Sequence, residues 1–223
     1  MEVGLYAFPR PKLNTGIVNV KDYGVKGDGI SNDDALIQAV INKFPAGTTF
    51  YFPSGTYKLA AKIQLTKQVQ ITGQFPLFKP TTNTQVFEVT STGSYTKFSF
   101  LKFQGEGKDT ASRASQYGIY INGAGYTETF GCQFTGFPGA GFGYTNTQTN
   151  GTLGGTITAC TFNANKVGIE SLSRGEYFCI TGCNASSNDV GIRQAGGNNL
   201  VDTCNFNYCL VGLDIIQEVF EQL

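Results

Sequence analysis

Apolar and polar residues alternate over short runs through much of this chain, and Asn or Gly follows most of the runs. An alternation of period two is typical of β-strands, and the Val, Ile, Phe and Thr of these runs favour strands over helices. Three runs align on a cysteine that is followed by a glycine eight positions later, at Cys160–Gly168, Cys183–Gly191 and Cys204–Gly212. The pattern predicts one repeated strand unit rather than a set of unrelated strands.

The repeat unit is short. Its cysteines lie 23 and then 21 residues apart, and a looser copy begins at Cys132. A period in this range is typical of a stacked solenoid, in which each unit packs only on its neighbours. Because turn formers and β-branched residues dominate the unit, we predict that each copy is one coil of a parallel β-helix.

Two segments have a helical period instead. Residues 32–44 place apolar side chains at i, i+3, i+4 and i+7, and Asn32 is a candidate N-cap with acidic residues behind it. Residues 215–223 contain the same apolar spacing. Because the ends of a solenoid expose unpaired strand edges, we predict that both helices cap the stack. The second helix has self-association as an alternative role.

The chain divides into one solenoid domain, an N-terminal arm and two polar insertions. The 223 residues suffice for one well-buried domain, which we assign to residues 18–223. Residues 1–17 lack a period and contain two prolines, so they predict an extended N-terminal arm that is either frayed or docks on another protein. Two polar insertions, 104–116 and 143–155, are expected to stand away from the stack as solvated connections or as binding sites.

Composition narrows the chemistry. The 16 basic and 16 acidic residues cancel, so neither nucleic acid nor an anionic membrane is a favoured partner. Histidine is absent, which removes the commonest proton shuttle and transition-metal ligand, and we expect neither a metal site nor a cofactor. The recurring cysteines are predicted to be buried free thiols, because rungs about 4.8 Å apart are too wide for disulfides.

The N-terminal quarter carries a more specific pattern. It contains Asp-Tyr-Gly-Val-Lys-Gly-Asp-Gly at 22–29, Asp-Asp at 33–34 followed by Ile-Gln, and Tyr-Phe-Pro-Ser-Gly-Thr-Tyr at 51–57. In this order and spacing, residues 18–73 resemble the N-terminal signature of the pectate-lyase-like superfamily, which includes polysaccharide lyases, polygalacturonases and phage tailspikes. The resemblance implies an all-β fold, a single-stranded right-handed parallel β-helix. The repeats predict about seven coils.

Each repeat ends in an apolar residue followed by a charged one, which places Glu170, Arg193 and Asp214 at equivalent positions. Since strand side chains alternate between faces, these residues should form one outward column, with Phe142 on the rung before them. Strand spacing puts each carboxylate about 5 Å from Arg193 and about 10 Å from the other carboxylate. An arginine between two carboxylates lowers their pKa values, whereas a general acid needs a raised one. The column is therefore a surface charge ladder or a recognition site for a charged or hydroxylated sugar.

Aromatic side chains beside the two insertions are candidate platforms for sugar rings. They are Tyr117, Tyr120, Tyr126, Phe142 and Tyr144. Another set, two residues after the ladder cysteines, is expected in the core: Phe134, Phe162 and Phe206. The predicted ligand-binding residues are thus Tyr120, Phe142, Tyr144, Glu170, Arg193 and Asp214.

The catalytic motifs of the related enzymes do not carry over. Polygalacturonases have an Asn-Thr-Asp, a later Asp-Asp, a Gly-His-Gly and an Arg-Ile-Lys, none of which occurs after the N-terminal signature. Calcium-dependent pectate lyases have clustered aspartates, whereas those past residue 80 are scattered here: Asp109, Asp189, Asp202 and Asp214. Asp189 lies beside Asn188 in a predicted turn, where both residue types are favoured for backbone reasons alone.

These observations favour a phage spike or tail component, located in the virion, that recognises host-surface polysaccharide without a family-type active site. The resemblance implies a homotrimer, and the N-terminal arm would attach it to other virion proteins. The first alternative is an extracellular polysaccharide lyase or glycoside hydrolase that acts on an acidic polysaccharide. The second is a purely structural virion protein.

Overall fold

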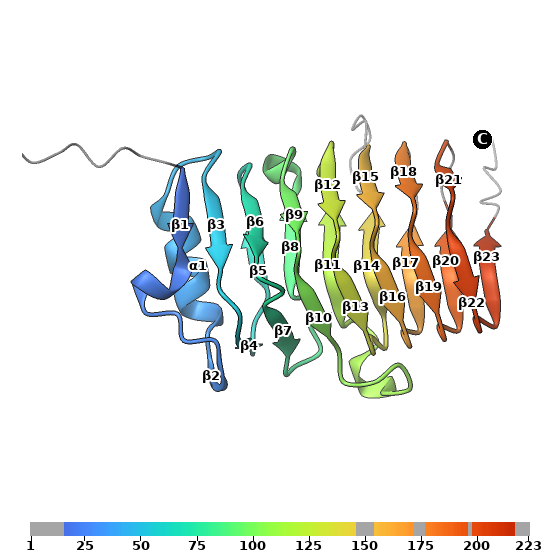
Figure 1. The fold of residues 1–223 in the computed structure, drawn as a ribbon, viewed down its shortest axis with the longest axis horizontal. Coiled ribbons are helices and arrows are strands. Elements are labelled where there is room, and N and C mark those ends of the chain that lie inside the picture. Colours follow the sequence, from blue (N-terminus) through green and yellow to red (C-terminus); the bar gives the residue numbers. More distant parts are fainter. Residues whose placement is uncertain (1–15, 146–153, 172–176, 196–197, 217–223) are drawn as a thin grey trace, which may run out of the picture.

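The computed structural model describes residues 16–145, 154–171, 177–195 and 198–216. The chain winds as one solenoid whose strands form three sheets along its long axis (Figure 1). Neighbouring strands in each sheet are parallel, as in Val18–Phe50 and Phe134–Phe162. The fold is the predicted right-handed parallel β-helix. Within the described residues the sheets have eight, eight and seven strands, which agrees with about seven coils.

The three sheets follow one another in every coil. Sheet A consists, in spatial order, of β1 (Ile17–Asn19), β3 (Thr49–Phe52), β6 (Gln70–Gly73), β9 (Lys97–Ser99), β12 (Thr127–Phe130), β15 (Gly155–Thr158), β18 (Phe178–Thr181) and β21 (Leu200–Asp202). Sheet B consists of β2 (Asp28–Asn32), β4 (Thr56–Leu59), β7 (Leu77–Pro80), β10 (Lys102–Gln104), β13 (Gln133–Thr135), β16 (Thr161–Asn163), β19 (Asn184–Ser186) and β22 (Asn205–Asn207). Sheet C consists of β5 (Ile63–Leu65), β8 (Phe87–Thr90), β11 (Tyr117–Asn122), β14 (Ala140–Thr145), β17 (Val167–Ser171), β20 (Val190–Gln194) and β23 (Val211–Ile215). The described connections contain the 3-10 helices η1 (Val20–Tyr23), η2 (Ser91–Gly93) and η3 (Ala111–Arg113).

The helix α1 (Asp34–Lys43) lies at the N-terminal end of the solenoid, as predicted for the first cap (Figure 1). Its buried apolar stripe consists of Ile37, Val40 and Ile41. The predicted N-cap is wrong by one residue, because Asn32 ends β2 and Asp33 is the N-cap. The carboxylate of Asp33 is buried and accepts hydrogen bonds from the backbone N–H groups of Lys26 and Gly27. It therefore ties the glycine-rich turn of the N-terminal signature to the start of the helix.

The other predicted terminal elements fall mainly outside the described residues. Residues 217–223, most of the predicted second cap, are not among them, and Ile215 is the last residue of β23. The same holds for residues 1–15 of the predicted arm, whereas Ile17 begins β1. Of the described part of the chain, no helix is long and apolar enough to cross a membrane.

The core is a stack of aromatic rings from sheet B. Phe103, Phe134 and Phe162 face one another on successive rungs, with ring centroids 4.8 and 4.9 Å apart and planes within 5° of parallel. Phe134 and Phe162 are completely buried and Phe206 is half-buried against the same core, which confirms their expected place. Parallel stacks of this kind form because equivalent inward positions of a solenoid meet directly above one another.

A second column in the core is the predicted cysteine ladder. Cys132, Cys160 and Cys183 are buried and Cys204 is half-buried, and all four are free thiols, as predicted. Each thiol after the first points to a carbonyl oxygen of the preceding coil, for example Cys183 Sγ to Ile157 O at 3.4 Å. The ladder therefore links coils without covalent bonds.

A buried amide ladder occupies the turn from sheet B to sheet C. Oδ1 of Asn188 accepts hydrogen bonds from both the backbone N–H and the side-chain amide of Asn165, at 2.8 and 3.0 Å. The Nδ2 group of Asn188 donates to Phe162 O at 2.9 Å. Buried polar groups are stable only when they are paired, and these amides satisfy the backbone groups of the turns. The turn preference predicted for Asn188 is thus reinforced by contacts between coils.

The first polar insertion does not stand away from the stack as expected. Gln104 belongs to β10, and the connection after it lies along the coils, because the ammonium group of Lys108 contacts Asp189 Oδ1 at 2.7 Å. Lys166 contacts the other oxygen of Asp189 at 2.6 Å. Asp189 therefore has a role beyond its turn, contrary to our prediction. In the second insertion, residues 143–145 belong to β14 and residues 146–153 lie outside the described part.

Candidate functional site

The predicted outward column exists and lies on sheet C. Glu170, Arg193 and Asp214 face one another on successive rungs. The guanidinium of Arg193 contacts Glu170 Oε1 through Nη1 at 3.2 Å and Asp214 Oδ2 through Nε at 3.1 Å. Burial alone lowers the pKa of Arg193, but the hydrogen bonds to both carboxylates outweigh it and raise the pKa. The expected ladder of alternating charge is confirmed.

Two aromatic members of the predicted ligand-binding set, Phe142 and Tyr144, face the core instead of the outer surface. Gly143, rather than Phe142, is the rung before Glu170, and Phe142 pairs with Ile169. Because side chains alternate between faces, the outward position of Gly143 turns both of its neighbours inward. Phe142 is 0% exposed, and Tyr144 is 1% exposed with its ring centroid 4.0 Å from that of Phe178. Neither ring is available to a ligand.

Toward the N-terminus the column continues through Tyr120, a predicted ligand-binding residue, and then through Glu88, which we did not predict. Tyr120 lies on the rung before Gly143, and Glu88 lies on the rung before Tyr120. Glu88 is 6% exposed and accepts hydrogen bonds from Lys62 Nζ at 2.6 Å, from Asn122 Nδ2 and from Gln64 Nε2. Burial raises the pKa of Glu88, but these three donors together hold it below the usual value. The carboxylate is ionised near neutral pH.

Two tyrosines fill the space above Gly143. The rings of Tyr117 and Tyr120 lie 5.3 Å apart, and the Tyr117 hydroxyl donates to Glu170 Oε2 at 2.8 Å. Burial, and then the charge of Glu170, raises the pKa of Tyr117; burial and Glu88 raise that of Tyr120. Both hydroxyls therefore remain protonated near neutral pH and act as hydrogen-bond donors. With an ionised Glu88 and two protonated phenols, the column is suited to holding hydroxyl groups rather than to transferring protons.

A second set of aromatic side chains lies at the corner where sheet C turns into sheet A. We name Tyr95, Tyr126 and Tyr177 the corner tyrosines. They are 53%, 51% and 52% exposed. The rings of Tyr95 and Tyr126 stack at 5.0 Å with 11° between their planes. Gly154, immediately before β15, occupies the rung between Tyr126 and Tyr177 and carries no ring.

The three corner tyrosines have an unusual backbone conformation. The three corner tyrosines have φ of +65°, +55° and +61°. At these three corners the backbone is left-handed, a conformation that Gly and Asn adopt at least cost and that is an outlier for a bulky side chain. A large aromatic ring thus occupies three corners where a glycine would fit better. Of these residues our sequence analysis named only Tyr126; the available signal was a tyrosine at a turn just before a strand.

Sheet A offers a polar face beside the corner tyrosines. Its outer positions include Lys97 and Glu128, which form an ion pair at 2.9 Å, followed by Thr156. Exposed rings also lie along the opposite edge of this sheet: Phe75, Phe100 and Phe130. Hydroxyl and charged groups between two margins of exposed rings are the elements that sugar recognition needs.

No cluster of three or more potential metal ligands occurs within the described ranges.

The model of a family described as "Rhamnogalacturonase A/epimerase, pectate lyase-like" matches residues 17–214. Among curated proteins, a probable glucan endo-1,3-β-glucosidase of Arthroderma benhamiae is 40% identical over 57 residues, which are 26% of this chain and 6% of that protein. Mannuronan C5-epimerase AlgE4 of Azotobacter vinelandii is 51% identical over 45 residues, which are 19% of this chain and 8% of that protein. The matches thus span less than a tenth of these relatives.

Solved structures with the same fold include two phage proteins. ORF18 of Geobacillus virus E2 has a TM-score of 0.57 at 21% identity, over 88% of this chain and 50% of that one. The pre-mature gene product 12 of bacteriophage phi29 has a TM-score of 0.71 at 15% identity, over 88% and 30%. The A-module of AlgE4 has a TM-score of 0.54 at 20% identity, over 88% and 69%. Similarity at these identities shows a common fold alone.

Proposed function

The chain belongs to the rhamnogalacturonase A/epimerase, pectate lyase-like family, and from this premise we propose that it is a polysaccharide-binding component of a phage virion. The resemblance inferred from residues 18–73 is thereby confirmed. Members of the fold that act on polysaccharides, such as the mannuronan epimerase, support a glycan as the ligand. The two phage proteins of the same fold support a virion location. From a glycan ligand and a virion location together we infer a host-surface polysaccharide as the target.

The corner tyrosines are the observation that carries the proposal. Three exposed rings are held at the surface by a backbone conformation that disfavours them, so the fold itself does not account for their presence. The stacked pair of Tyr95 and Tyr126, and Tyr177 two coils further on, provide aromatic positions along one line, with Gly154 between them. A linear polysaccharide also presents repeated apolar faces along one line, and it would lie along this corner.

The column on sheet C supports binding rather than catalysis. Its carboxylates are engaged by donors from neighbouring rungs, and the pKa shifts of Glu88 and its tyrosines point away from proton exchange near neutral pH. Arg193 and Asp214 have side chains that are 32% and 35% exposed. We propose that these two residues, with Tyr120, make secondary contacts to glycan hydroxyls. Glu170 is 8% exposed and both its oxygens accept hydrogen bonds, from Tyr117 and Arg193, so it positions Arg193 rather than contacting the glycan.

A binding assay with purified protein and surface polysaccharide from candidate host bacteria tests this function. We expect Tyr95→Asn, Tyr126→Asn and Tyr177→Asn each to weaken binding roughly threefold to tenfold, the value of one lost stacking contact. The matched control is Tyr208→Asn, because Tyr208 is also an exposed tyrosine with φ of +54° but lies at a different corner. Asn tolerates the left-handed conformation, so all four variants should fold.

Three outcomes would contradict the proposal. Equal affinity of the corner variants and the wild-type protein would remove the tyrosines from the site. Accumulation of reducing ends or unsaturated products during the incubation would establish a hydrolase or lyase instead. Absence of binding to every polysaccharide would favour a purely structural virion protein.

The proposed partners have their own test. We propose that the protein is a homotrimer and that the N-terminal arm attaches it to other virion proteins. Light scattering should give a mass of about three times 24.0 kDa. A strict monomer would count against a spike.

A further inference from the structure

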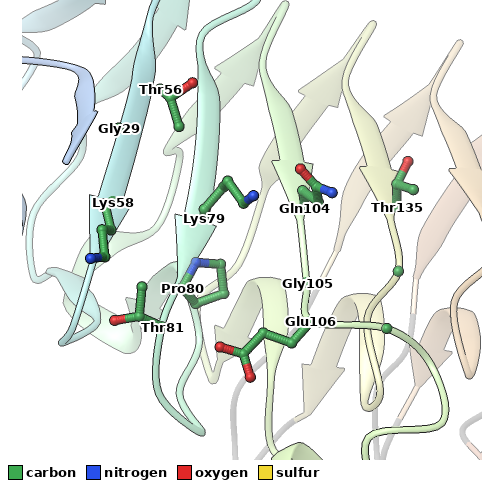
Figure 2. Close-up of a pocket in the computed structure, with 12 residues that line it drawn as sticks. Gly29, Thr56, Lys58, Lys79, Pro80, Thr81, Gln104, Gly105, Glu106 and Thr135 are labelled. Atoms are coloured by element: carbon green, nitrogen blue, oxygen red, sulfur yellow. The ribbon is translucent and has the colours of Figure 1, made fainter.

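One connection between strands is much longer than its counterparts in other coils. The turn from sheet B to sheet C after β10 spans residues 105–116, which we name the strap, whereas residues 164–166, 187–189 and 208–210 suffice in later coils. The strap begins at the wall of a groove of about 680 Å³ on sheet B, where Figure 2 shows Gly105 and Glu106 leaving β10. Because a turn as short as 187–189 closes this corner, the fold does not require the rest of the strap.

The base of the strap is fixed to the coil before it. The side chain of Gln116 is completely buried, and its Nε2 group donates to Thr82 O at 2.9 Å while its Oε1 accepts from the Glu106 N–H at 3.1 Å. The backbone N–H of Ser115 donates to Asn83 Oδ1 at 2.8 Å. Thr82 and Asn83 follow β7, so both ends of the strap are held near the strand from which it departs.

The middle of the strap contacts a coil much farther along the solenoid. The ammonium group of Lys108 contacts Asp189 Oδ1 at 2.7 Å and donates to Ser187 O at 3.4 Å. Both acceptors follow β19, which is the third strand after β10 in the order of sheet B. Three rungs correspond to about 14 Å along the axis. Since each coil of a solenoid otherwise contacts only its neighbours, the strap adds a contact that the repeat does not contain.

The last described coil shows why such a contact matters. Val211 and Leu213 of β23 are 43% and 41% exposed, whereas their partners in β20, Val190 and Ile192, are 7% and 2% exposed. The apolar interior is thus exposed at this coil, and local opening begins where few buried contacts hold the chain. Lys108 holds the adjacent coil, which consists of β18, β19 and β20.

We propose that the strap is a latch that stops local opening of the solenoid from spreading beyond its last coil. The coil of β18, β19 and β20 can separate from the preceding one only when Lys108 releases Asp189 and Ser187. Lys166, which contacts the other oxygen of Asp189 at 2.6 Å, joins neighbouring coils only. The latched coil also carries Arg193, so the latch holds this part of the sheet C column in place while the last coil opens.

Hydrogen exchange of the native full chain, followed by mass spectrometry, measures the opening of each coil. We expect Lys108→Gln to speed exchange in β18, β19 and β20 about fivefold, the effect of one lost ion pair. Exchange in β3 and β6 should not change. Asn83→Ala loosens the base of the strap four rungs before Asp189, and it should speed exchange in the same three strands about twofold. The strap is the described connection through which this effect would travel.

Lys166→Gln is the matched control, because it removes the other cation from the same carboxylate. It should speed exchange in the coil of Asp189 and leave the strap unchanged, whereas Lys108→Gln should speed both. An increase confined to the strap in Lys108→Gln, or no response of β18, β19 and β20 to Asn83→Ala, would overturn the proposal. So would equal exchange of the strap in the two lysine variants. No ligand is needed, so the result is independent of the proposed function.

Discussion

The hydroxyl of Tyr117 donates a hydrogen bond of 2.8 Å to Oε2 of Glu170, across the rung that Gly143 occupies. A Cβ atom at Gly143 would lie 2.7 Å from two ring carbons of Tyr117. The absent side chain therefore creates the space in which the ring lies. This hydrogen bond connects residues that are 53 positions apart in the sequence, and it fixes the Tyr117 ring in the middle of the sheet C column.

Gly143→Ala should displace the Tyr117 ring and break its bond to Glu170. Overpacking of this kind costs about 1–3 kcal/mol, and we expect the free energy of unfolding in a denaturant titration to fall by that amount. Gly154→Ala is a suitable control, since the nearest atom to its added Cβ would be at 3.4 Å. An equal effect of the two substitutions would mean that the tyrosine is free to move.

Asn188→Ala should be among the most destabilising amide substitutions in the chain. It leaves two donors of Asn165 and the carbonyl oxygen of Phe162 without the partners that they have now. Buried groups left unpaired cost about 1–3 kcal/mol each, so we expect a loss of about 2–4 kcal/mol in the free energy of unfolding. Asn184→Ala, at an exposed position of β19, should change it by less than about 0.5 kcal/mol. Similar losses for both variants would contradict a role specific to the ladder.

Asp189→Asn should destabilise the protein in a pH-dependent way. The hydrogen bonds from Lys108, and then from Lys166, lower the pKa of Asp189. A carboxyl group whose pKa is lower in the folded state stabilises that state above its unfolded pKa of about 3.9. This contribution is lost as the pH falls through the folded-state pKa. At pH 7 we expect the variant to be less stable by about 1 kcal/mol.

The measurement is the difference in unfolding free energy between wild-type and Asp189→Asn proteins from pH 7 down to pH 3. The difference should shrink as the pH falls below about 4, since the wild-type carboxyl is then protonated as well. Asp202→Asn, at an exposed position, serves as the control. A difference that stays constant over this range would show that the loss arises from packing rather than from charge.

The ladder thiols should react slowly in the native protein. The neighbouring thiol of Cys160, and then burial, raises the pKa of Cys183, and a thiol rather than a thiolate is a poor nucleophile. With a disulfide reagent at pH 8, we expect Cys183 to be modified only as the protein unfolds. Half-buried Cys179, on the outer face of sheet A, should react first. Mass spectrometry of the modified peptides would identify the order, and early modification of Cys183 would contradict a closed core.

The solenoid and much of its interior were predictable because equivalent residues of successive repeats occupy equivalent positions in the fold. Once Cys160, Cys183 and Cys204 are aligned, every equivalent position has the same environment, so the phenylalanine stack and the Arg193 ladder follow from alternation alone. The prediction for Phe142 failed where the repeat is irregular. In the looser copy that begins at Cys132, the glycine that aligns with Gly168 is Gly141, nine positions after the cysteine rather than eight. The resulting alignment error of one residue reversed the face of every side chain on that strand.

The candidate surfaces depended on information that a single coil does not contain. Lys108 and Asp189 are 81 residues apart in the sequence. The connection that contains Lys108 is not part of the repeat, and it approaches Asp189 only in the folded protein. The corner tyrosines follow strands of different lengths, so their alignment depends on how many residues each corner accommodates. The connections between rungs differ in length, and the apolar–polar pattern of the strands does not predict where a connection places its side chains.

The sequence alone therefore determined the parallel β-helix, its free cysteines and the alternating charges of sheet C, because these depend on local alternation and on a period that the chain itself displays. The tertiary structure decided which rings reach the surface, how Tyr117 lies over Gly143 and where Lys108 crosses the coils to contact Asp189. These features depend on the register between coils, which loop lengths and packing set together.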